Sequence, residues 1–138
     1  MQSIALGLLM VLAADSAPPT LPPCQRTPNC VSTHGKGTQA IAPFRYSGTG
    51  KVAMERLVAI LEKMPRTTVI SASPTSLTVE FKTAFFRFTD DAIFIIDDRT
   101  KTIQFRSASR VGRSDLGVNR RRMEKLRESF ERSDRSEK

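Results

Sequence analysis

The chain has 138 residues, which is enough for one folded domain and excludes two. Eight phenylalanines, together with isoleucine, valine and leucine, supply the apolar material for a core, although tryptophan is absent. The formal net charge is +8 at pH 7 and is unevenly distributed, since the segment 106–127 holds eight Lys or Arg residues and two acids and contributes +6. A positive field concentrated in this way favours phosphate, carboxylate or acidic polymers as partners.

The chain begins with a short apolar stretch at residues 4–14. These residues are too few to cross a bilayer, which takes about 20, but they fit the apolar region of a secretory signal. We therefore predict a signal peptide over residues 1–14 and an exported, periplasmic protein. An uncleaved membrane anchor is the alternative, because no Lys or Arg precedes the apolar stretch.

A proline-rich linker is predicted over residues 15–30, and it contains both cysteines of the chain, Cys24 and Cys30. In an oxidising compartment, a disulfide that closes this short loop is the ordinary interpretation. The only histidine, His34, follows closely, so two cysteines and one histidine offer three ligands for zinc, but a structural zinc site usually has four. We expect a disulfide, no metal site and no cofactor.

The next segments are predicted to be a loop region and a helix. Gly, Ser and Thr dominate residues 31–50, which indicates loops, with a short strand at 40–45. Apolar residues then recur with the period of an amphipathic helix over 51–64. Thr49 is placed to cap this helix and Pro65 to end it.

Four strands are expected after this helix, because the period of the apolar residues changes to two. Their predicted ranges are 67–73, 77–82, 92–97 and 102–108. The third range is apolar on both faces and is expected at the centre of the sheet. Short connections between consecutive strands predict an antiparallel meander.

A second amphipathic helix is predicted over about 116–130, with Ser114 or Asp115 as its cap. Asn119 falls on the apolar stripe of this helix, where burying an unpaired amide costs about 1–3 kcal/mol. We therefore expect Asn119 to bond to groups on the preceding strand and loop. The charged residues 131–138 are expected to form a flexible tail.

The predicted fold class of residues 31–130 is α+β: a single domain in which a four-stranded antiparallel meander carries two helices on one face. Adjacent residues of a strand point to opposite faces, so the doublets Asp90–Asp91 and Asp97–Asp98 do not present paired carboxylates to a metal ion or a reaction. We interpret the first doublet as partners of arginines and the second as a hairpin turn.

Three segments resemble a known family. RSASRVGRSDLGVNRRR at 106–122 is similar to the C-terminal signature of the domain-of-unknown-function family numbered 1499, CQRTPNCVST at 24–33 to its N-terminal motif, and FTDD at 88–91 to its central motif. The resemblance covers residues 21–127 and departs at Gln25, where that family commonly has proline. It implies a small bacterial or plastid protein, exported or membrane-linked, of a family without an established activity.

The 106–122 run is the candidate binding surface. Its predicted ligand-binding residues are polar or cationic and lie before or within the first turn of the second helix: Arg106, Ser107, Ser109, Arg110, Ser114, Asp115, Asn119 and Arg120. Free backbone N–H groups at a helix start attract anions, and arginine offers a forked geometry that suits phosphate or carboxylate. Against an anion site, Asp115 lies at this helix start and is able to occupy the same donors.

A purely structural interpretation uses the same residues, and it is the one we favour for the run itself. Asp115 caps the helix, and Asn119 anchors it to the sheet. Arg106 or Arg110 pairs with one of the two ion-pair candidates, Asp90 and Asp91.

No catalytic set is assembled in the sequence. A nucleophilic Cys30 with His34 as its base lacks an acid to orient the histidine, and a disulfide consumes the thiol. The basic second helix lacks the interleaved aromatics and groove-reading motifs of nucleic-acid binders, so nucleic acid is not expected as a partner.

We therefore predict a non-enzymatic exported domain that binds an anionic ligand or a cell-envelope partner through the 106–122 surface. The candidate partners are an anionic small molecule, a lipid headgroup, an envelope polymer or a protein. One alternative is a hydrolase built from three carboxylates and two arginines: Asp90, Asp91, Asp115, Arg106 and Arg110. The other alternative is a purely structural envelope protein.

Overall fold

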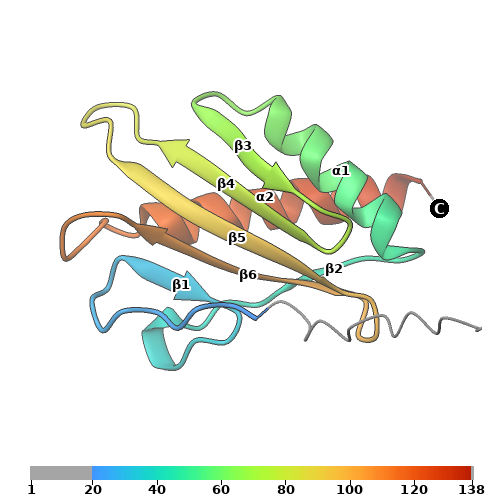
Figure 1. Ribbon diagram of the computed structural model, residues 1–138, viewed down its shortest axis with the longest axis horizontal. Helices are drawn as coiled ribbons and strands as arrows, with labels where there is room; N and C mark the ends of the chain where they lie inside the picture. Colours follow the sequence, from blue (N-terminus) through green and yellow to red (C-terminus); the bar gives the residue numbers. More distant parts are fainter. Residues whose placement is uncertain (1–19, 138) are drawn as a thin grey trace, which may run out of the picture.

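The computed structural model describes residues 20–137, in which two helices lie against one antiparallel sheet (Figure 1). The strands are β1 (Cys30–Ser32), β2 (Phe44–Arg45), β3 (Thr67–Ala72), β4 (Ser76–Lys82), β5 (Thr89–Asp97) and β6 (Thr102–Ser109). The helices are α1 (Gly50–Glu62), α2 (Val118–Ser136) and a short 3-10 helix, η1 (Gly37–Gln39). The predicted leader, 1–14, lies outside the described residues. Within them, neither helix is long and apolar enough to cross a membrane.

The sheet has six strands in the order β1-β6-β5-β4-β3, with β2 also paired to β6. The predicted four-strand meander is present as β3 to β6, and β5 is central. The predicted count of four strands is not confirmed, because β1 lies in the expected loop region and β2 lies within the short strand expected at 40–45. Both pair antiparallel with β6, through Cys30 opposite Ala108 and Phe44 opposite Ile103. At the other edge, β3 has a register shift between Val69 and Ser71.

Both helices cover the same face of the sheet, as predicted, and one apolar core fills the space between them. Helix α1 starts at its expected cap, where the N–H of Val52 donates to Oγ1 of Thr49 at 3.2 Å. Phenylalanine rings fill the centre of the core. The ring centroid of Phe44 lies 5.0 Å from that of Phe105 and 5.6 Å from that of Phe130, which ties β2, β6 and α2 together.

Helix α2 extends further than its apolar pattern predicts, since residues 131–136, expected to belong to a flexible tail, are helical. The helix continues to Ser136 because Asp134 is buried against the other elements. Its carboxylate lies 3.0 Å from Nη1 of the buried Arg56 on α1. The same carboxylate accepts hydrogen bonds from the backbone N–H and the hydroxyl of Ser47.

The expected disulfide joins Cys24 and Cys30. The predicted linker ends inside the fold, since Cys30 already belongs to β1 and Asn29 is buried. The side-chain amide of Asn29 donates to the carbonyl of Gly112 at 2.8 Å, which ties this segment to the loop after β6. Among residues 20–137, no group of three His, Cys, Asp or Glu side chains is placed to hold a metal ion.

Candidate functional site

Strand β6 sends the residues of the predicted binding surface to opposite faces of the sheet. Ser107 and Ser109 lie on the inner face, where they contact α2. Arg106 alternates with them and lies on the outer face, as does Arg110 just after the strand. The predicted surface is therefore two separate clusters with the sheet between them.

On the outer face, Arg110 forms an ion-pair cluster with two acids. Its guanidinium donates to both carboxylate oxygens of Asp91, at 2.7 and 2.9 Å, and pairs with Glu80. These bonds, first the one to Asp91, raise the pKa of Arg110 above its ordinary value. Arg106 is partly buried nearby, and its desolvation lowers its pKa. Of the pairings that the sequence left open, the structure has Arg110 with Asp91, so Arg110 is occupied within the protein.

On the inner face, a polar network surrounds the fully buried Asn119. Its amide oxygen accepts from the hydroxyl of Ser107 at 2.6 Å. Its amide nitrogen donates to Oγ of Ser109 at 3.1 Å and to Oδ2 of Asp115 at 2.8 Å. Asn119 thus anchors α2 to β6, which is the role that its place on the apolar stripe predicts.

Asp115 occupies the donors at the start of α2. Its carboxylate accepts from the backbone N–H of Gly117 at 2.8 Å and from that of Asn119 at 3.0 Å. Burial by itself raises the pKa of Asp115, but the hydrogen bonds from the Asn119 side chain and from these backbone groups outweigh it and lower the pKa. The helix start is therefore already filled by an internal anion.

Two other predicted residues lie apart from this network. Arg120 donates to the backbone carbonyls of Thr38 at 2.7 Å and Ala40 at 2.8 Å, and so fixes the segment around η1. The hydroxyl of Ser114 accepts from the backbone N–H of Leu116 at 3.3 Å. Neither side chain joins the groups around Asn119.

The partner of Asp90 is Arg122, a residue that the sequence analysis did not place in the site. Asp90 is only 1% exposed and lies 2.9 Å from Nη1 of Arg122. The guanidinium of Arg122 also lies over the ring of Phe81, 4.5 Å from its centroid. Within residues 20–137, neither carboxylate oxygen of Asp90 accepts a well-aligned hydrogen bond. A buried carboxylate with open lone pairs is unusual and is a candidate for contact with a ligand.

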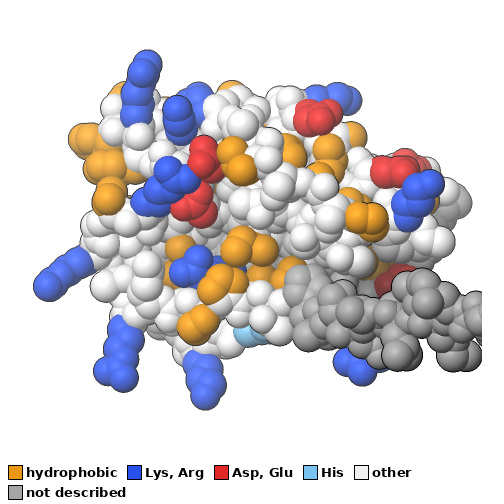
Figure 2. Space-filling model, in the orientation of Figure 1, with side chains coloured by type: hydrophobic (Ala, Val, Ile, Leu, Met, Phe, Trp, Pro, Cys, Tyr) orange, Lys and Arg blue, Asp and Glu red, His pale blue; other side chains and the backbone are white. Residues whose placement is uncertain are grey.

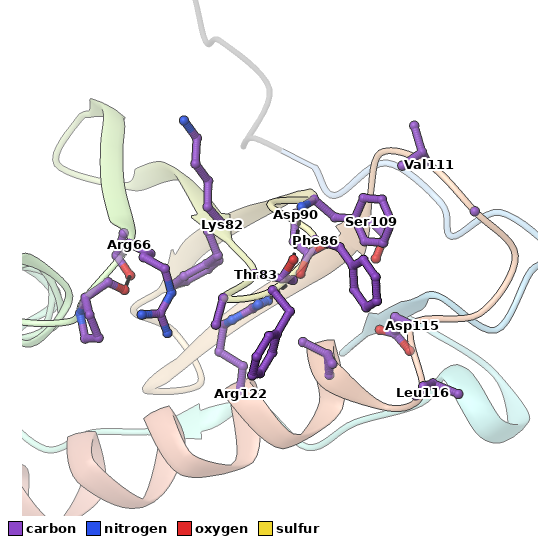
Figure 3. A pocket seen from close by; sticks show the side chains of 18 of the residues that line it. Arg66, Lys82, Thr83, Phe86, Asp90, Ser109, Val111, Asp115, Leu116 and Arg122 are labelled. Carbon is purple, nitrogen blue, oxygen red and sulfur yellow. Dashed lines mark hydrogen bonds and ion pairs between the residues drawn. The ribbon is translucent and has the colours of Figure 1, made fainter.

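These inner groups form part of the lining of a groove of about 630 Å³ (Figure 3). The groove lies between the β4–β5 loop, residues 83–88, and the β6–α2 loop, residues 110–117. Its polar lining includes Asp90, Ser109 and Arg122. The remaining lining is mainly apolar and includes Phe81, Phe85, Phe86, Phe88, Val111 and Leu116.

Sequence reasoning missed the aromatic side of this groove. The signal was present as Phe85, Phe86 and Phe88, three phenylalanines within four residues that follow the end of a predicted strand. In the structure all three are exposed, and Phe86 stacks on Phe88 with ring centroids 5.5 Å apart. A loop with this composition is not a core element and indicates a contact surface.

The loops beside the groove also contain backbone strain. Arg66, Arg87 and Leu116 have φ values of 54°, 52° and 54°, in the left-handed region that costs a non-glycine residue about 1 kcal/mol or more. Arg87 lies in the β4–β5 loop and Leu116 in the β6–α2 loop, while Arg66 precedes β3 and lines the groove. Such strain persists where the surrounding structure dictates the shape of a loop.

The structure does not bring together the carboxylates and arginines of the hydrolase alternative. Asp90 and Asp115 lie on the inner side of the sheet, whereas Asp91, Arg106 and Arg110 lie on its outer side. A reaction needs its acid, base and charged groups around one substrate atom. These five side chains do not share such a point.

Fold and site together define a small α+β domain with an apolar groove at one end of its sheet. A family model described as "Protein of unknown function (DUF1499)" matches residues 20–130, and the chain belongs to this family. Neither a curated protein nor a solved structure matches the chain.

Proposed function

We propose that the protein is a non-enzymatic binding domain that holds an amphipathic small molecule in the groove between the β4–β5 and β6–α2 loops. The groove itself carries this proposal. Its volume of about 630 Å³ lies within the range of roughly 300–1,000 Å³ that is typical of small-molecule sites. Such sites are mostly apolar with a few convergent polar groups, and this one has the same composition.

The polar lining favours a particular kind of ligand end. Asp90 and Arg122 present opposite charges next to each other, so their net field is small and a strongly charged group gains little from both. Asp90 retains free lone pairs, and Ser109 adds a hydroxyl. A neutral group that donates a hydrogen bond, such as a hydroxyl or an amide, best satisfies Asp90, Arg122 and Ser109, while the apolar body of the ligand lies against the phenylalanines. The exposed Arg66 and Lys82 also line the groove.

The position of the site also changes the binding hypothesis drawn from the sequence. An anion bound at the start of α2 has to displace Asp115, which already accepts two backbone hydrogen bonds there. Arg110 and Arg120 are engaged with Asp91 and with backbone carbonyls. These contacts support the groove, rather than the arginines of the 106–122 run, as the place where a small ligand is held.

Uptake of an apolar fluorescent dye, 1-N-phenylnaphthylamine, tests the proposal. Ala84 is exposed and lines the groove, so Ala84→Trp introduces a large side chain at the groove without removing a core contact. We expect saturable dye binding by the unmodified chain and a severalfold weaker affinity in Ala84→Trp. Ala72→Trp is the matched control, because Ala72 is also exposed but lies on β3 outside the groove lining. Absence of saturable binding, or equal effects of the two substitutions, contradicts the proposal.

A further inference from the structure

The β4–β5 and β6–α2 loops, which border the groove, carry apolar side chains that are largely exposed to solvent. Phe85 is 94% exposed, Phe86 77% and Leu116 82%. The β4–β5 and β6–α2 loops lie at the same end of the molecule, the left end in Figure 1. Figure 2 shows apolar side chains gathered at this end, with Lys and Arg side chains around them. An exposed apolar cluster with a polar border is typical of a surface that contacts another body.

The border of this cluster is cationic. Five Lys or Arg residues at this end are exposed and, within residues 20–137, form no ion pair: Arg66, Lys82, Arg87, Arg113 and Arg121. Four of them lie in the two loops or in the flanking segments, and Arg66, which precedes β3, lies beside Lys82, whose backbone N–H donates to the Arg66 carbonyl at 2.9 Å. The carboxylates that line the groove are engaged, since Asp90 pairs with Arg122 and Asp115 bonds to the start of α2. The positive charge at this end is therefore not compensated within the protein.

Backbone hydrogen bonding and ring stacking fix the positions of these apolar side chains. Leu116 has a φ of 54° and precedes Gly117, whose φ is 79°. Asp115 fixes this turn through its bond to the N–H of Gly117. Phe86 is stacked on Phe88, so the two rings of the β4–β5 loop already lie against each other. Little ordering of these loops is needed before they contact a partner.

We propose that this end of the molecule docks on an anionic lipid bilayer. Phe85, Phe86 and Leu116 enter the interfacial layer, while the five cations lie among the lipid headgroups. Charge favours a bilayer over a second copy of the chain, because two copies that meet at this end bring two uncompensated positive borders together. The docking surface is defined by exposed side chains and does not depend on whether the groove holds a ligand.

Vesicle flotation with the full chain tests the docking. Vesicles of phosphatidylcholine alone are compared with vesicles that also contain phosphatidylglycerol, at low and high salt. Because residues 4–14 are apolar and can add binding of their own, the readout is the difference between variants of the same full chain. We expect binding that requires phosphatidylglycerol and weakens as salt screens the headgroup charge.

Two sets of substitutions separate the apolar and the charged contributions. The double substitution Phe85→Ser/Phe86→Ser removes two interfacial side chains and should weaken vesicle binding about tenfold or more. Arg87→Gln and Arg113→Gln should each weaken vesicle binding roughly fivefold at low salt, because a single cation near anionic headgroups contributes about that much to the affinity. Val52→Ser and Arg99→Gln are the matched controls, because both residues are exposed and lie outside the two loops and their flanking segments.

Each outcome bears on the proposal. Loss of binding in the loop variants with retention in the controls supports docking. Binding that ignores phosphatidylglycerol, or equal loss in loop and control variants, overturns it. A chain that dimerises through this end and does not float with vesicles also overturns it, and assigns the surface to a second copy. Dye uptake by Arg87→Gln without vesicles reports on the groove separately, so either proposal can fail while the other stands.

Discussion

Asp115 combines two functions that usually fall to separate residues. It caps α2 through the backbone N–H groups of Gly117 and Asn119, and it accepts from the Asn119 side chain that anchors the helix. The sequence predicted both a cap at Ser114 or Asp115 and an anchoring Asn119, because a polar residue on an apolar stripe requires partners. It did not predict that one carboxylate serves both.

The lowered pKa of Asp115 makes this cap dependent on pH. The carboxylate is more acidic in the folded than in the unfolded chain, so its stabilisation is complete above the unfolded pKa of about 4 and is lost as the pH falls through the folded pKa. We expect Asp115→Asn to lower the free energy of unfolding by about 1 kcal/mol at neutral pH. The difference from the unmodified chain should shrink at acid pH.

Urea unfolding at a series of pH values measures this effect. The control is Glu128→Gln, because Glu128 is exposed on the same helix and, among the residues that the structure describes, pairs only with the exposed Arg132. A loss of stability that is the same at acid and neutral pH contradicts a titrating cap.

The partner of Asp90 was not predicted from the sequence. Alternation along a strand predicted that Asp90 and Asp91 point to opposite faces. The sequence left open whether Arg106 or Arg110 pairs with Asp90 or Asp91, and in the structure Arg110 bonds to Asp91. The partner of Asp90 is Arg122, one of three consecutive arginines on α2. Arg122 is three residues after Asn119 and four before Leu126, so it borders the apolar stripe that faces the sheet. Its pairing with Asp90 depends in addition on the position of the helix along the sheet, which is set by packing.

At the scale of elements, α1 and β3 to β6 follow from periodicity, because each is long enough to repeat its pattern. The short strands β1 and β2 have three and two residues and carry no period. They are strands because β6 offers a free edge to which they bond, through pairs such as Val31 with Ser107. Their positions thus depend on contacts that are distant in the sequence.

The extension of α2 past Phe130 has the same kind of cause. Residues 131–136 are charged and look like a solvated tail, but Arg56 on α1 needs a partner for its buried guanidinium. That partner, Asp134, is 78 positions away in the sequence. Local composition does not reveal such a pair.

We expect Asp134→Ala to lower the free energy of unfolding by about 3 kcal/mol, because it leaves the buried charge of Arg56 with Glu137 alone. Chemical denaturation gives the magnitude, and helix content by circular dichroism should fall as the last turns of α2 loosen. Glu128→Ala removes an exposed pair from the same helix and should cost less than about 1 kcal/mol. Equal effects of the two substitutions rule out a structural role for the buried pair.

At the scale of the whole molecule, the sequence predicted the class of fold and the helix-covered face, but not the groove. A groove forms where loops from different parts of the chain meet, and here the loops at 83–88 and 110–117 are brought together by the pairing of β5 with β6. The sequence shows the run at 106–122 as a cluster of positive charge, but in the structure its side chains lie on two opposite faces of the sheet. Its contribution to the groove combines the polar Ser109, Asp115 and Arg122 with the apolar Val111, Leu116 and Val118.

The N-terminal segment connects the disulfide to the groove. Cys24 bonds to Cys30, and Asn29 next to it bonds to Gly112 in the β6–α2 loop. Replacing both cysteines by serine should lower the free energy of unfolding by about 2 kcal/mol, because the unfolded chain gains the freedom of a short closed loop. Amide exchange in the β6–α2 loop should also become faster, since the segment that holds Gly112 is less constrained.

Hydrogen exchange with and without a reductant measures both effects in the same chain. Exchange at α1, which does not contact this segment through the disulfide or Asn29, is the internal control. Unchanged protection of residues 110–117 after reduction contradicts the connection.

The register shift in β3 affects how copies of the protein behave when they meet at high concentration. β1 and β3 are the two ends of the strand order, and β3, with six residues against three, is the longer of these edges in the described part of the chain. An unbroken row of backbone donors and acceptors there is a template for a strand from another molecule and for fibril growth. The irregularity between Val69 and Ser71 interrupts that row at the exposed Ile70, so the longer edge strand does not offer an unbroken template to another molecule.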